Sequence, residues 1–428
     1  MAGDTTDDAR AVPVSGATGF VGRRVVAAWR AQVRARRCAA RTPARAQDLV
    51  ADGVEVIGGD VLDAGGTEPR GAGAKAASAA APAALWLRSP GGSLHVGPAS
   101  VPTPGAGELV VRARAVAVNP IDALGGVARR VVLPWLRYPA VLGSDVAREV
   151  VAVGAGVEGI RAGDRVVGYA VGVERSRNSA AEGAFRTHVT LLRHLTAPIP
   201  GTMSFEQACV LPLALTTAGA GLFERDQLAL RLPTAGASPS GEVVLVLGGA
   251  TSVGMNAIQL AHRAGYTVVV TASVANTAAL ERLGASVVVD YHDADVVEQI
   301  VGHLAGRYLA GTLVLASGAV GQAVAIAAAP RVPGTRRVAS AHPTPRTRVQ
   351  GVLARRRAVH VTAIWGGRPK DTPVGPALWV GFLPGALATG RYLAAPGPVV
   401  VGHGLDTIPA ALRRLRQGAR AQKFVVSL

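Results

Sequence analysis

The second half of the chain alternates short apolar runs with segments of helical character. Five consecutive apolar residues, Val243–Leu247, are followed by a glycine-rich turn and a helical segment over residues 255–262. A second strand-like run covers residues 267–271, a helical segment surrounds residues 278–283, and a third apolar run covers residues 287–289. Buried strands that alternate with helices predict βαβ units and therefore a parallel sheet.

The turn after the first strand is rich in glycine. A strand, a glycine turn and a helix in succession aim free backbone N–H groups and the positive end of the helix at one point, which suits a pyrophosphate. A side chain at the glycines would hold the backbone away from the phosphates. We therefore expect a dinucleotide site here, the alternative being a purely structural strand–turn–helix. The candidate cofactor-binding residues of this turn are Gly248, Gly249, Ala250, Thr251, Ser252, Val253 and Gly254.

The end of the second strand bears on the choice of dinucleotide. NAD sites usually place Asp or Glu about 20 residues past the glycines to hold the ribose 2′-OH, whereas residues 272–276 of this chain read ASVAN. No carboxylate in that stretch opposes a 2′-phosphate, and Ser273, Asn276 and the later Tyr291 offer hydrogen bonds to one. The pattern favours NADPH. Ser273 and Asn276 could also cap the next helix, and the two roles can coexist.

Shorter β-type runs precede the nucleotide unit. Runs separated by Pro and Gly fill residues 85–118, and further strands are expected at 149–153 and 164–169, which predicts a small β-rich domain. We place this β-rich domain at residues 84–202, the nucleotide-binding domain at 203–364, and a C-terminal segment, which we expect to return to the β-rich domain, at 365–428. That segment is expected to contain a strand, a helix over 407–417 and a strand over 423–427.

Residues 1–63 contain a second nucleotide-type pattern. A G-x-x-G-x-x-G turn over residues 16–22 leads into a helical segment, with strand-like runs at 36–40 and 54–57. The block resembles the start of an NmrA-like short-chain dehydrogenase, with Arg41 where a 2′-phosphate would lie. No tyrosine in the chain is followed four residues later by lysine, so the catalytic pair of that family is absent. We predict a partial NAD(P)-binding-like fragment, either a remnant without turnover or a weak nucleotide binder. A Gly/Ala-rich linker follows at 64–83.

Composition narrows the class of protein further. The net charge is +17, and only three of the 45 basic residues are lysine; scattered arginines without a nucleic-acid module indicate solvated faces rather than nucleic-acid binding. The two cysteines, Cys38 and Cys209, lie far apart, which excludes a disulfide framework. The first ten residues are polar, and the apolar run at 313–330 contains Ser, Gly and Gln, so we expect neither a signal peptide nor a membrane span. A cytoplasmic location is the default expectation.

Several motifs carry a more specific resemblance. The chain from about residue 85 onward is similar to zinc-free medium-chain dehydrogenases/reductases of the quinone reductase and enoyl reductase branch, and most similar to the trans-acting enoyl reductases. The resemblance implies an α/β architecture, a GroES-like β-rich catalytic domain with a doubly wound, parallel Rossmann domain. The motifs are Asn119-Pro120-Ile121-Asp122, Gly143-Ser144-Asp145, Gly163-Asp164-Arg165-Val166, residues 211–218 (LPLALTTA), the glycine turn, and Asp290-Tyr291.

The resemblance also implies metal-free chemistry. Zinc-dependent members carry Cys where Asn119 stands and Gly-His-Glu where residues 143–145 read GSD, and two cysteines cannot supply a structural zinc lobe. Hydride transfer from NADPH to a polarised C=C bond or a quinone is then the implied reaction. Implied site residues are Asn119, Asp122 and Ser144 beside the nicotinamide, Thr217 beneath it, and Lys423 near a phosphate. Asn119 could equally form a turn, and Asp122 could satisfy backbone donors.

Two departures from the family pattern leave an alternative function open. Arg148 stands where members commonly have Gly, in a place where a backbone crossing offers little room, and Ala275 stands where many have Lys. The alternative is therefore a catalytically weak NADPH-binding protein. We expect a small-molecule substrate, free or carried by an acyl carrier protein, and a monomer or homodimer.

Overall fold

The computed structural model describes residues 37–40, 55–58, 81–342 and 344–428. The chain divides into two compact units, Met1–Ala79 and Ala80–Leu428. In the first unit, β1 (Arg37–Ala40) and β2 (Glu55–Gly58) pair in parallel, at the positions of the two predicted strand-like runs. The glycine turn at 16–22 and Arg41 lie outside the described residues, so the nucleotide-type fragment stays a prediction.

The second unit begins with a lobe built on a seven-stranded sheet. The strand order is β10-β8-β7-β5-β18-β17, with β9 also paired to β5, and only the β17–β18 pair is parallel. A three-stranded antiparallel sheet, β4-β3-β6, covers part of the lobe. The bounds are β3 Ala83–Leu87, β4 Leu94–Pro98, β5 Glu108–Ala117, β6 Ala140–Val141, β7 Asp145–Val153, β8 Arg165–Tyr169, β9 His188–Leu192, β10 Thr196–Pro198, β17 Pro398–His403 and β18 Lys423–Ser427.

The first lobe also contains short helices. They are α3 (Gly126–Val132), η3 (Ala180–Glu182), η4 (Arg193–Leu195), η9 (Leu405–Thr407) and α13 (Ile408–Arg416). α13 packs on β17 and β18, with Ile408, Ala411 and Leu412 buried against the sheet. One core joins the two sheets of the lobe, since valines and leucines of β3, β5, β7 and β9 belong to the same buried cluster.

The second lobe is a six-stranded parallel sheet in the order β13-β12-β11-β14-β15-β16, which is the strand order of a dinucleotide-binding sheet. All five residues of β11 are buried, as expected for a central strand covered on both faces. The bounds are β11 Val243–Leu247, β12 Thr267–Ala272, β13 Val287–Asp290, β14 Leu309–Val314, β15 Arg337–Ser340 and β16 His360–Ala363. The predicted α/β fold class is confirmed.

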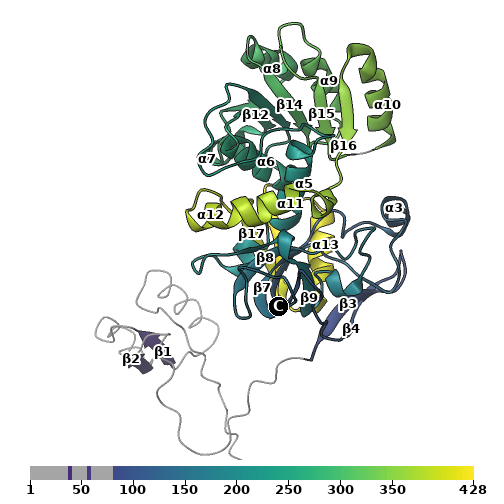
Figure 1. The fold of residues 1–428 in the computed structure, drawn as a ribbon, viewed down its shortest axis with the longest axis vertical. Helices are drawn as coiled ribbons and strands as arrows, with labels where there is room; N and C mark the ends of the chain where they lie inside the picture. Colours follow the sequence, from purple (N-terminus) through teal and green to yellow (C-terminus); the bar gives the residue numbers. More distant parts are fainter. Residues whose placement is uncertain (1–36, 41–54, 59–80, 343) are drawn as a thin grey trace, which may run out of the picture. The chain divides into compact units, whose positions relative to one another are not determined.

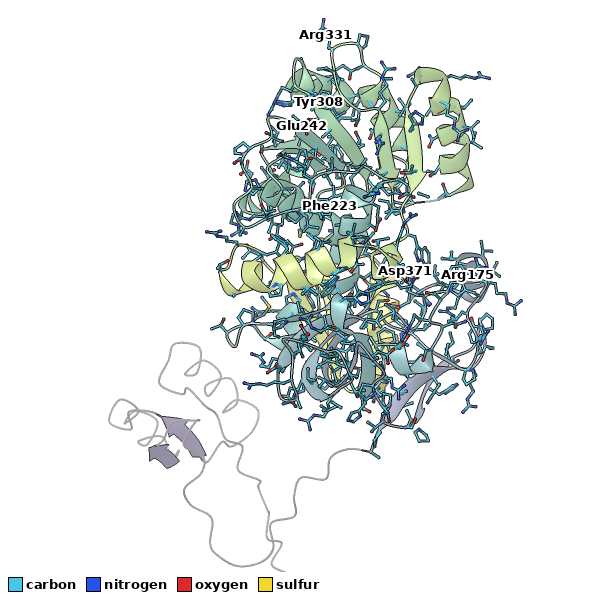
Figure 2. All side chains as sticks on the ribbon, viewed as in Figure 1. Arg175, Phe223, Glu242, Tyr308, Arg331 and Asp371 are labelled. Atoms are coloured by element: carbon cyan, nitrogen blue, oxygen red, sulfur yellow. The ribbon has the colours of Figure 1, made fainter. Side chains whose placement is uncertain are left out.

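Helices lie between and around these strands. They are α6 (Ser252–Arg263), η5 (Val274–Asn276), α7 (Thr277–Arg282), α8 (Val296–Leu304), α9 (Val320–Ala327), α10 (Pro345–Ala354) and η6 (Arg355–Arg357). Glu242 and Tyr308, labelled in Figure 2, directly precede β11 and β14 and mark the amino edge of the sheet. The glycine turn therefore lies at the opposite, carboxyl edge, where ligands bind in open parallel sheets.

Two crossings join the lobes. The outward crossing contains α4 (Phe205–Ala208) and α5 (Pro212–Phe223), and the return contains η7 (Arg368–Asp371), α11 (Val374–Pro376), the π-helix η8 (Ala377–Phe382) and α12 (Leu383–Ala388). α5 packs on α6 and α11, and Figure 1 shows α5, α11 and α12 between the two sheets. The side-chain amides of Asn256 and Gln259 in α6 bind the backbone of Ala395 and Leu393, which fixes the return segment to α6.

Within the described part of the chain, no helix combines the length and the apolar character needed to cross a membrane.

Candidate active site

The glycine turn forms the sharp link between β11 and α6. Gly248 has φ +103°, a backbone conformation that a side chain strains. The Thr251 hydroxyl accepts the Gly254 N–H at 3.0 Å and donates to the Gly248 carbonyl at 2.9 Å. This N-cap starts α6 at Ser252, three residues before the predicted start at 255. Gly254 therefore lies inside the helix, where a Cβ would come within 2.4 Å of the Gly248 carbonyl oxygen.

That contact changes the reason for the glycines. The predicted reason was close approach of the pyrophosphate to the backbone, but the structure shows protein atoms around two of them. A Cβ at Gly254 would meet the turn's own carbonyls, and a Cβ at Gly249 would lie 3.1 Å from the Val270 side chain. These glycines thus allow the turn to fold tightly against α6 and β12, which in turn positions the helix N-terminus.

The N-terminus of α6 offers unpaired donors. The first N–H groups of a helix have no intrahelical acceptor; here Thr251 accepts from Gly254 and Met255. Among the described residues, no hydrogen-bond acceptor is found for the Ser252 and Val253 N–H groups. Two free N–H groups on a 12-residue helix, with its positive dipole end, fit the pyrophosphate of a dinucleotide.

The proposed adenosine end of this site has a different arrangement from the one expected. Asn276 donates from its side-chain amide to the Ser273 hydroxyl at 2.8 Å. Neither side chain caps η5 or α7, so the helix-capping alternative is not what the structure shows. The two side chains instead hold each other beside the end of β12, and both are half-buried. Tyr291 is exposed and its ring stacks on His292 at a centroid distance of 4.1 Å.

The carboxylate of Asp290, which the sequence indicated only as part of a family motif, lies close to this end. Asp290 ends β13 and is the register partner of Ala272. Its carboxylate accepts from the backbone N–H and the Nδ1 of His292, at 3.0 and 2.8 Å, and these hydrogen bonds lower the pKa of Asp290. Inspection of residues 272–276 alone could not reveal it, because the neighbouring strand delivers it. Asp290 is therefore a candidate determinant of the cofactor's 2′ group.

Asn119 belongs to a buried polar cluster in the first lobe. Its side-chain amide donates to Asp145 at 2.8 Å, and its carbonyl oxygen accepts from the Lys423 ammonium. Lys423 is 2.8 Å from Asp145, which is fully buried. The second Asp145 oxygen accepts the Leu213 N–H at 2.6 Å, at the start of α5. β18 thus brings Lys423 into the lobe as the counter-charge of Asp145, and this geometry gives no support to its predicted contact with a phosphate.

Asp122 holds the backbone around this cluster. Its two oxygens accept from the Asn119 N–H at 2.9 Å and the Gly143 N–H at 3.1 Å, which is the backbone-satisfying role left open as the alternative. Ser144 follows Gly143 and is buried, yet its hydroxyl has no hydrogen-bond partner among the described residues. A buried hydroxyl without a partner is costly, which makes Ser144 a candidate for contact with a ligand.

Asp122 should make the stability of the protein depend on pH. Burial, reinforced by the charge of Asp145, raises the pKa of Asp122 from 3.8 to about 7. Between these values the folded protein keeps a proton that the unfolded chain has released, so the free energy of unfolding falls as the pH rises from about 4 to about 7. In Asp122→Asn we expect this slope to be much weaker. Urea denaturation at pH 5 and pH 8 would show it, and parallel pH curves for both proteins would contradict the raised pKa.

Thr217 lies on α5 next to the return segment. A Cβ at Gly366 would be 2.3 Å from the Thr217 hydroxyl oxygen, so only glycine allows this approach. The neighbouring Trp365 donates from its indole N–H to Glu174 at 2.8 Å, and Tyr169 donates to the other Glu174 oxygen at 2.8 Å. Glu174 and Trp365 were not predicted as site residues; no local signal marks them, because they are 191 positions apart.

Arg148 finds room inside the first lobe. Its side chain is fully buried in β7 and donates to the carbonyls of Ala184 at 2.7 Å and Arg186 at 3.2 Å. Burial lowers the pKa of the guanidinium, with a smaller contribution from the charge of Arg186. The Arg148 side chain thus fits into the place that was expected to offer little room, and it links β7 to the segment before β9.

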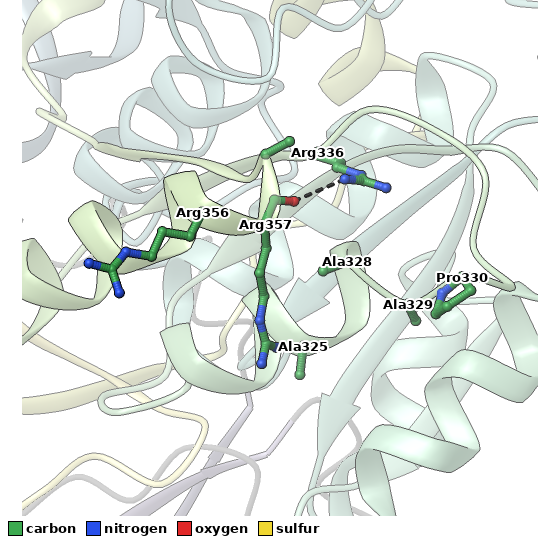
Figure 3. A pocket seen from close by; sticks show the side chains of 8 residues that line it. Ala325, Ala328, Ala329, Pro330, Arg336, Arg356 and Arg357 are labelled. Atoms are coloured by element: carbon green, nitrogen blue, oxygen red, sulfur yellow. Dashed lines mark hydrogen bonds between the residues drawn. The ribbon is translucent and has the colours of Figure 1, made fainter.

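One cavity of the second lobe lies away from the glycine turn. Its volume is about 520 Å³, and it is lined by Ala325, Ala328, Ala329, Pro330, Arg336, Arg356, Arg357 and Ala358 (Figure 3). Arg336 and η6 precede β15 and β16, so the cavity lies at the amino edge of the sheet. The free N–H groups of α6 lie at the opposite, carboxyl edge, so this cavity is not part of the candidate active site.

The described residues include no cluster of three or more His, Cys, Asp or Glu side chains arranged to hold a metal ion.

Known proteins resemble this chain over most of its length. The model of the alcohol dehydrogenase GroES-like domain matches residues 105–204. Dehydrogenase pigH of Monascus ruber is 42% identical over 355 residues, covering 78% of this chain and 96% of that protein. Trans-enoyl reductase himH of Aspergillus japonicus is 33% identical over 340 residues, covering 78% and 94%. The crystal structure of an alcohol dehydrogenase superfamily protein from Novosphingobium aromaticivorans aligns with a TM-score of 0.64 at 22% identity, covering 81% of this chain and 99% of that chain.

Proposed function

Because the chain belongs to the medium-chain dehydrogenase/reductase superfamily of oxidoreductases, we propose that it is a zinc-free, NADPH-dependent reductase. Its substrate would be an activated C=C bond, in an enoyl thioester or enone, or a quinone. The name of the himH relative, a trans-enoyl reductase, supports the first of these. We further propose that the substrate is a small molecule, free or carried by an acyl carrier protein.

One observation carries the proposal. The centre of the GroES-like lobe holds an amide, a hydroxyl and a carboxylate–ammonium pair at Asn119, Ser144 and Asp145–Lys423. None of these positions offers a thiolate or imidazole, the ligands that zinc favours. The α6 N-terminus with two free N–H groups supplies the complementary half, a place for the cofactor's pyrophosphate. Binding a dinucleotide and polarising a substrate without a metal is the chemistry that this combination supports.

The protein's own residues would orient and polarise the reactants. Bound NADPH would supply the hydride. We assign the Ser144 hydroxyl, buried without a partner, to the substrate's carbonyl oxygen, where it would stabilise the negative charge that develops during reduction. Asp145 and Lys423 would hold Asn119 in place, and Thr217 would lie against the nicotinamide half.

The direct test is oxidation of NADPH, followed by its absorbance, with quinones, enones and enoyl thioesters. We expect turnover with at least one of these classes and a large loss in Ser144→Ala with wild-type affinity for NADPH. Tight NADPH binding without turnover on any of them would favour the catalytically weak NADPH-binding protein instead. The departures from the family pattern at Arg148 and Ala275 are the reason for keeping this alternative.

Cofactor choice gives a separate prediction. NADPH should bind more tightly than NADH. Ser273→Asp should reverse or erase this preference, because a carboxylate at the end of β12, in addition to Asp290 at the end of β13, would repel the 2′-phosphate and accept a hydrogen bond from the ribose hydroxyl. Asp290→Asn should strengthen the preference for NADPH. Dissociation constants from fluorescence titration would measure both effects, and equal affinity of the unmodified protein for the two cofactors would contradict the assignment.

Independence from metal is also testable. Residues 119 and 143–145 include no cysteine or histidine, and the one carboxylate among them, Asp145, is paired with Lys423, so activity should survive dialysis against a chelator. Elemental analysis of the purified protein should find no stoichiometric zinc. One zinc per chain, removed by the chelator together with the activity, would show that other residues form a metal site.

A further inference from the structure

Two tryptophans pack edge to face where the lobes meet. Trp135 and Trp365 have ring centroids 5.6 Å apart and an interplanar angle of 76°, and both are half-buried. Their polar atoms are occupied by consecutive residues of one loop. The Trp135 N–H donates to the Val173 carbonyl at 3.0 Å, and the Trp365 N–H donates to the Glu174 carboxylate at 2.8 Å. The accessible surface of the pair is therefore carbon.

The backbone places this pair next to the proposed reaction site. Trp365 follows β16 at the carboxyl edge of the parallel sheet, the same edge as the glycine turn. The next two residues are held by close approach, Gly366 against the Thr217 hydroxyl and Gly367 against Glu174. Asp371, labelled in Figure 2, ends the short helix that follows. Trp365 is thus the direct neighbour of Gly366, which packs against Thr217, the residue assigned to the nicotinamide half.

Glu174 is an unusual partner for an indole. It is 3% exposed, and its hydrogen bonds come from two neutral donors, Tyr169 and Trp365. Burial raises the pKa of this carboxyl, and the hydrogen bonds from Trp365 and Tyr169, followed by the charge of Lys370, lower it in part. Burying a carboxyl this deeply is costly, and an apolar side chain could fill the same volume. Unlike an apolar side chain, Glu174 accepts the Trp365 N–H, and it thereby fixes the direction of this N–H and the plane of the indole ring.

We propose that Trp135 and Trp365 form an apolar wall of the substrate site that selects long, unsaturated acyl chains, and that Glu174 is the positioning residue that orients Trp365. The inference rests on the proposed function, which supplies the reactive C=C bond. The saturated carbons beyond the double bond would pack on this wall and be removed from contact with water. Each methylene buried in this way should raise kcat/KM by roughly threefold to fourfold. Short enones would gain nothing from the wall.

The test is a series of trans-2-enoyl pantetheine thioesters with four, six, eight and ten carbons. For the unmodified protein we expect kcat/KM to rise along the series. In Trp365→Ala the rise should flatten, whereas Trp365→Phe should keep most of it. Trp86→Ala is a matched control, since Trp86 also donates its indole N–H to a carbonyl, that of Pro98, but in the three-stranded sheet. It should leave the dependence on chain length unchanged.

Glu174 variants separate positioning from mere support. Glu174→Leu should flatten the chain-length series as Trp365→Ala does. Glu174→Gln should restore much of the rise, because its carbonyl can accept from Trp365 while its amide donates to the Tyr169 oxygen. NADPH affinity should stay the same in all of these variants. A loss by one common factor at every chain length, or a flat series in the unmodified protein, would overturn the proposal.

Binding measurements keep the inference testable if no substrate class is reduced. Calorimetric titration of the NADPH complex with saturated butyryl and octanoyl pantetheine needs no turnover. Octanoyl pantetheine should bind at least tenfold more tightly than butyryl pantetheine, and Trp365→Ala should remove most of that difference. A preference that depends on Trp365, without reduction of any substrate, would refute the proposed function alone. Equal binding of the two thioesters would refute the aromatic wall.

Discussion

Replacement of Gly254 by valine is expected to abolish NADPH binding and all reductase activity. A Cβ at this position would lie 2.4 Å from the Gly248 carbonyl oxygen and 2.6 Å from that of Gly249, so the turn must open and the α6 N-terminus must move. Two charge-assisted hydrogen bonds to the pyrophosphate, each contributing about 1.5–3 kcal/mol, would be lost. The affinity should fall by at least about 100-fold.

A second variant guards against simple unfolding. In Ser252→Glu the new carboxylate lies in the first turn of α6, where it stabilises the helix by about 0.3–1 kcal/mol but repels the pyrophosphate. We expect the loss of NADPH binding with no loss of thermal stability. Gly302→Val is the matched control, because a Cβ at this helical glycine of α8 meets no atom within 4 Å. Titration of NADPH into each variant decides: unaffected binding in Ser252→Glu would move the cofactor away from α6.

Lys423→Met is expected to lower the free energy of unfolding by about 3–5 kcal/mol. The Lys423 side chain is 5% exposed and Asp145 is fully buried, so the variant leaves a carboxylate charge inside the lobe without its counter-charge. Asn119 loses a hydrogen-bond donor at the same time, which should also reduce turnover. Urea denaturation followed by circular dichroism would measure the change in stability.

The double variant Asp145→Asn/Lys423→Met distinguishes charge pairing from packing. With both charges removed, the amide at position 145 can still accept from Leu213 or Asn119, so the double variant should be more stable than Lys423→Met alone. If the two substitutions were simply additive, the lysine would stabilise the lobe by packing its aliphatic stem, and the pair would contribute little.

The fold was predictable because its strongest signals are local. The five buried residues of β11, the glycines of the turn and the alternation with α6 and β12 specify a βαβ unit without reference to distant residues. The start of α6 was placed too late because the Thr251 cap draws Ser252, Val253 and Gly254 into the helix. In a sequence, a glycine indicates a loop rather than the interior of a helix. The glycine at position 254 is explained only by its contact with the Gly248 carbonyl, which the structure shows.

The site was predictable only in part, because its contacts join distant segments. Asn119, Asp122 and Ser144 do meet in one buried region. Lys423, however, pairs with Asp145 across the sheet, a contact that depends on β18 lying beside β5. The same reason explains why Glu174 was not predicted and why Asp290 was named only as part of a family motif. Asp290 lies on a neighbouring strand, and Glu174 lies in a loop that meets the end of β16.

The first lobe is synthesised in two parts, because its strands come from both sides of the second lobe in the sequence. β3 to β10 leave the ribosome first, and the parallel sheet of residues 243–363 follows. β18 leaves the ribosome last, although it pairs with residues 115–117 of β5 and with β17. The second lobe is contiguous and can complete its six strands while the first still has an open sheet edge, the kind of surface that aggregates in nascent chains. Lys423 arrives with β18, so Asp145 also waits for its counter-charge. A growing chain therefore acquires its nucleotide-binding lobe before the lobe that faces it.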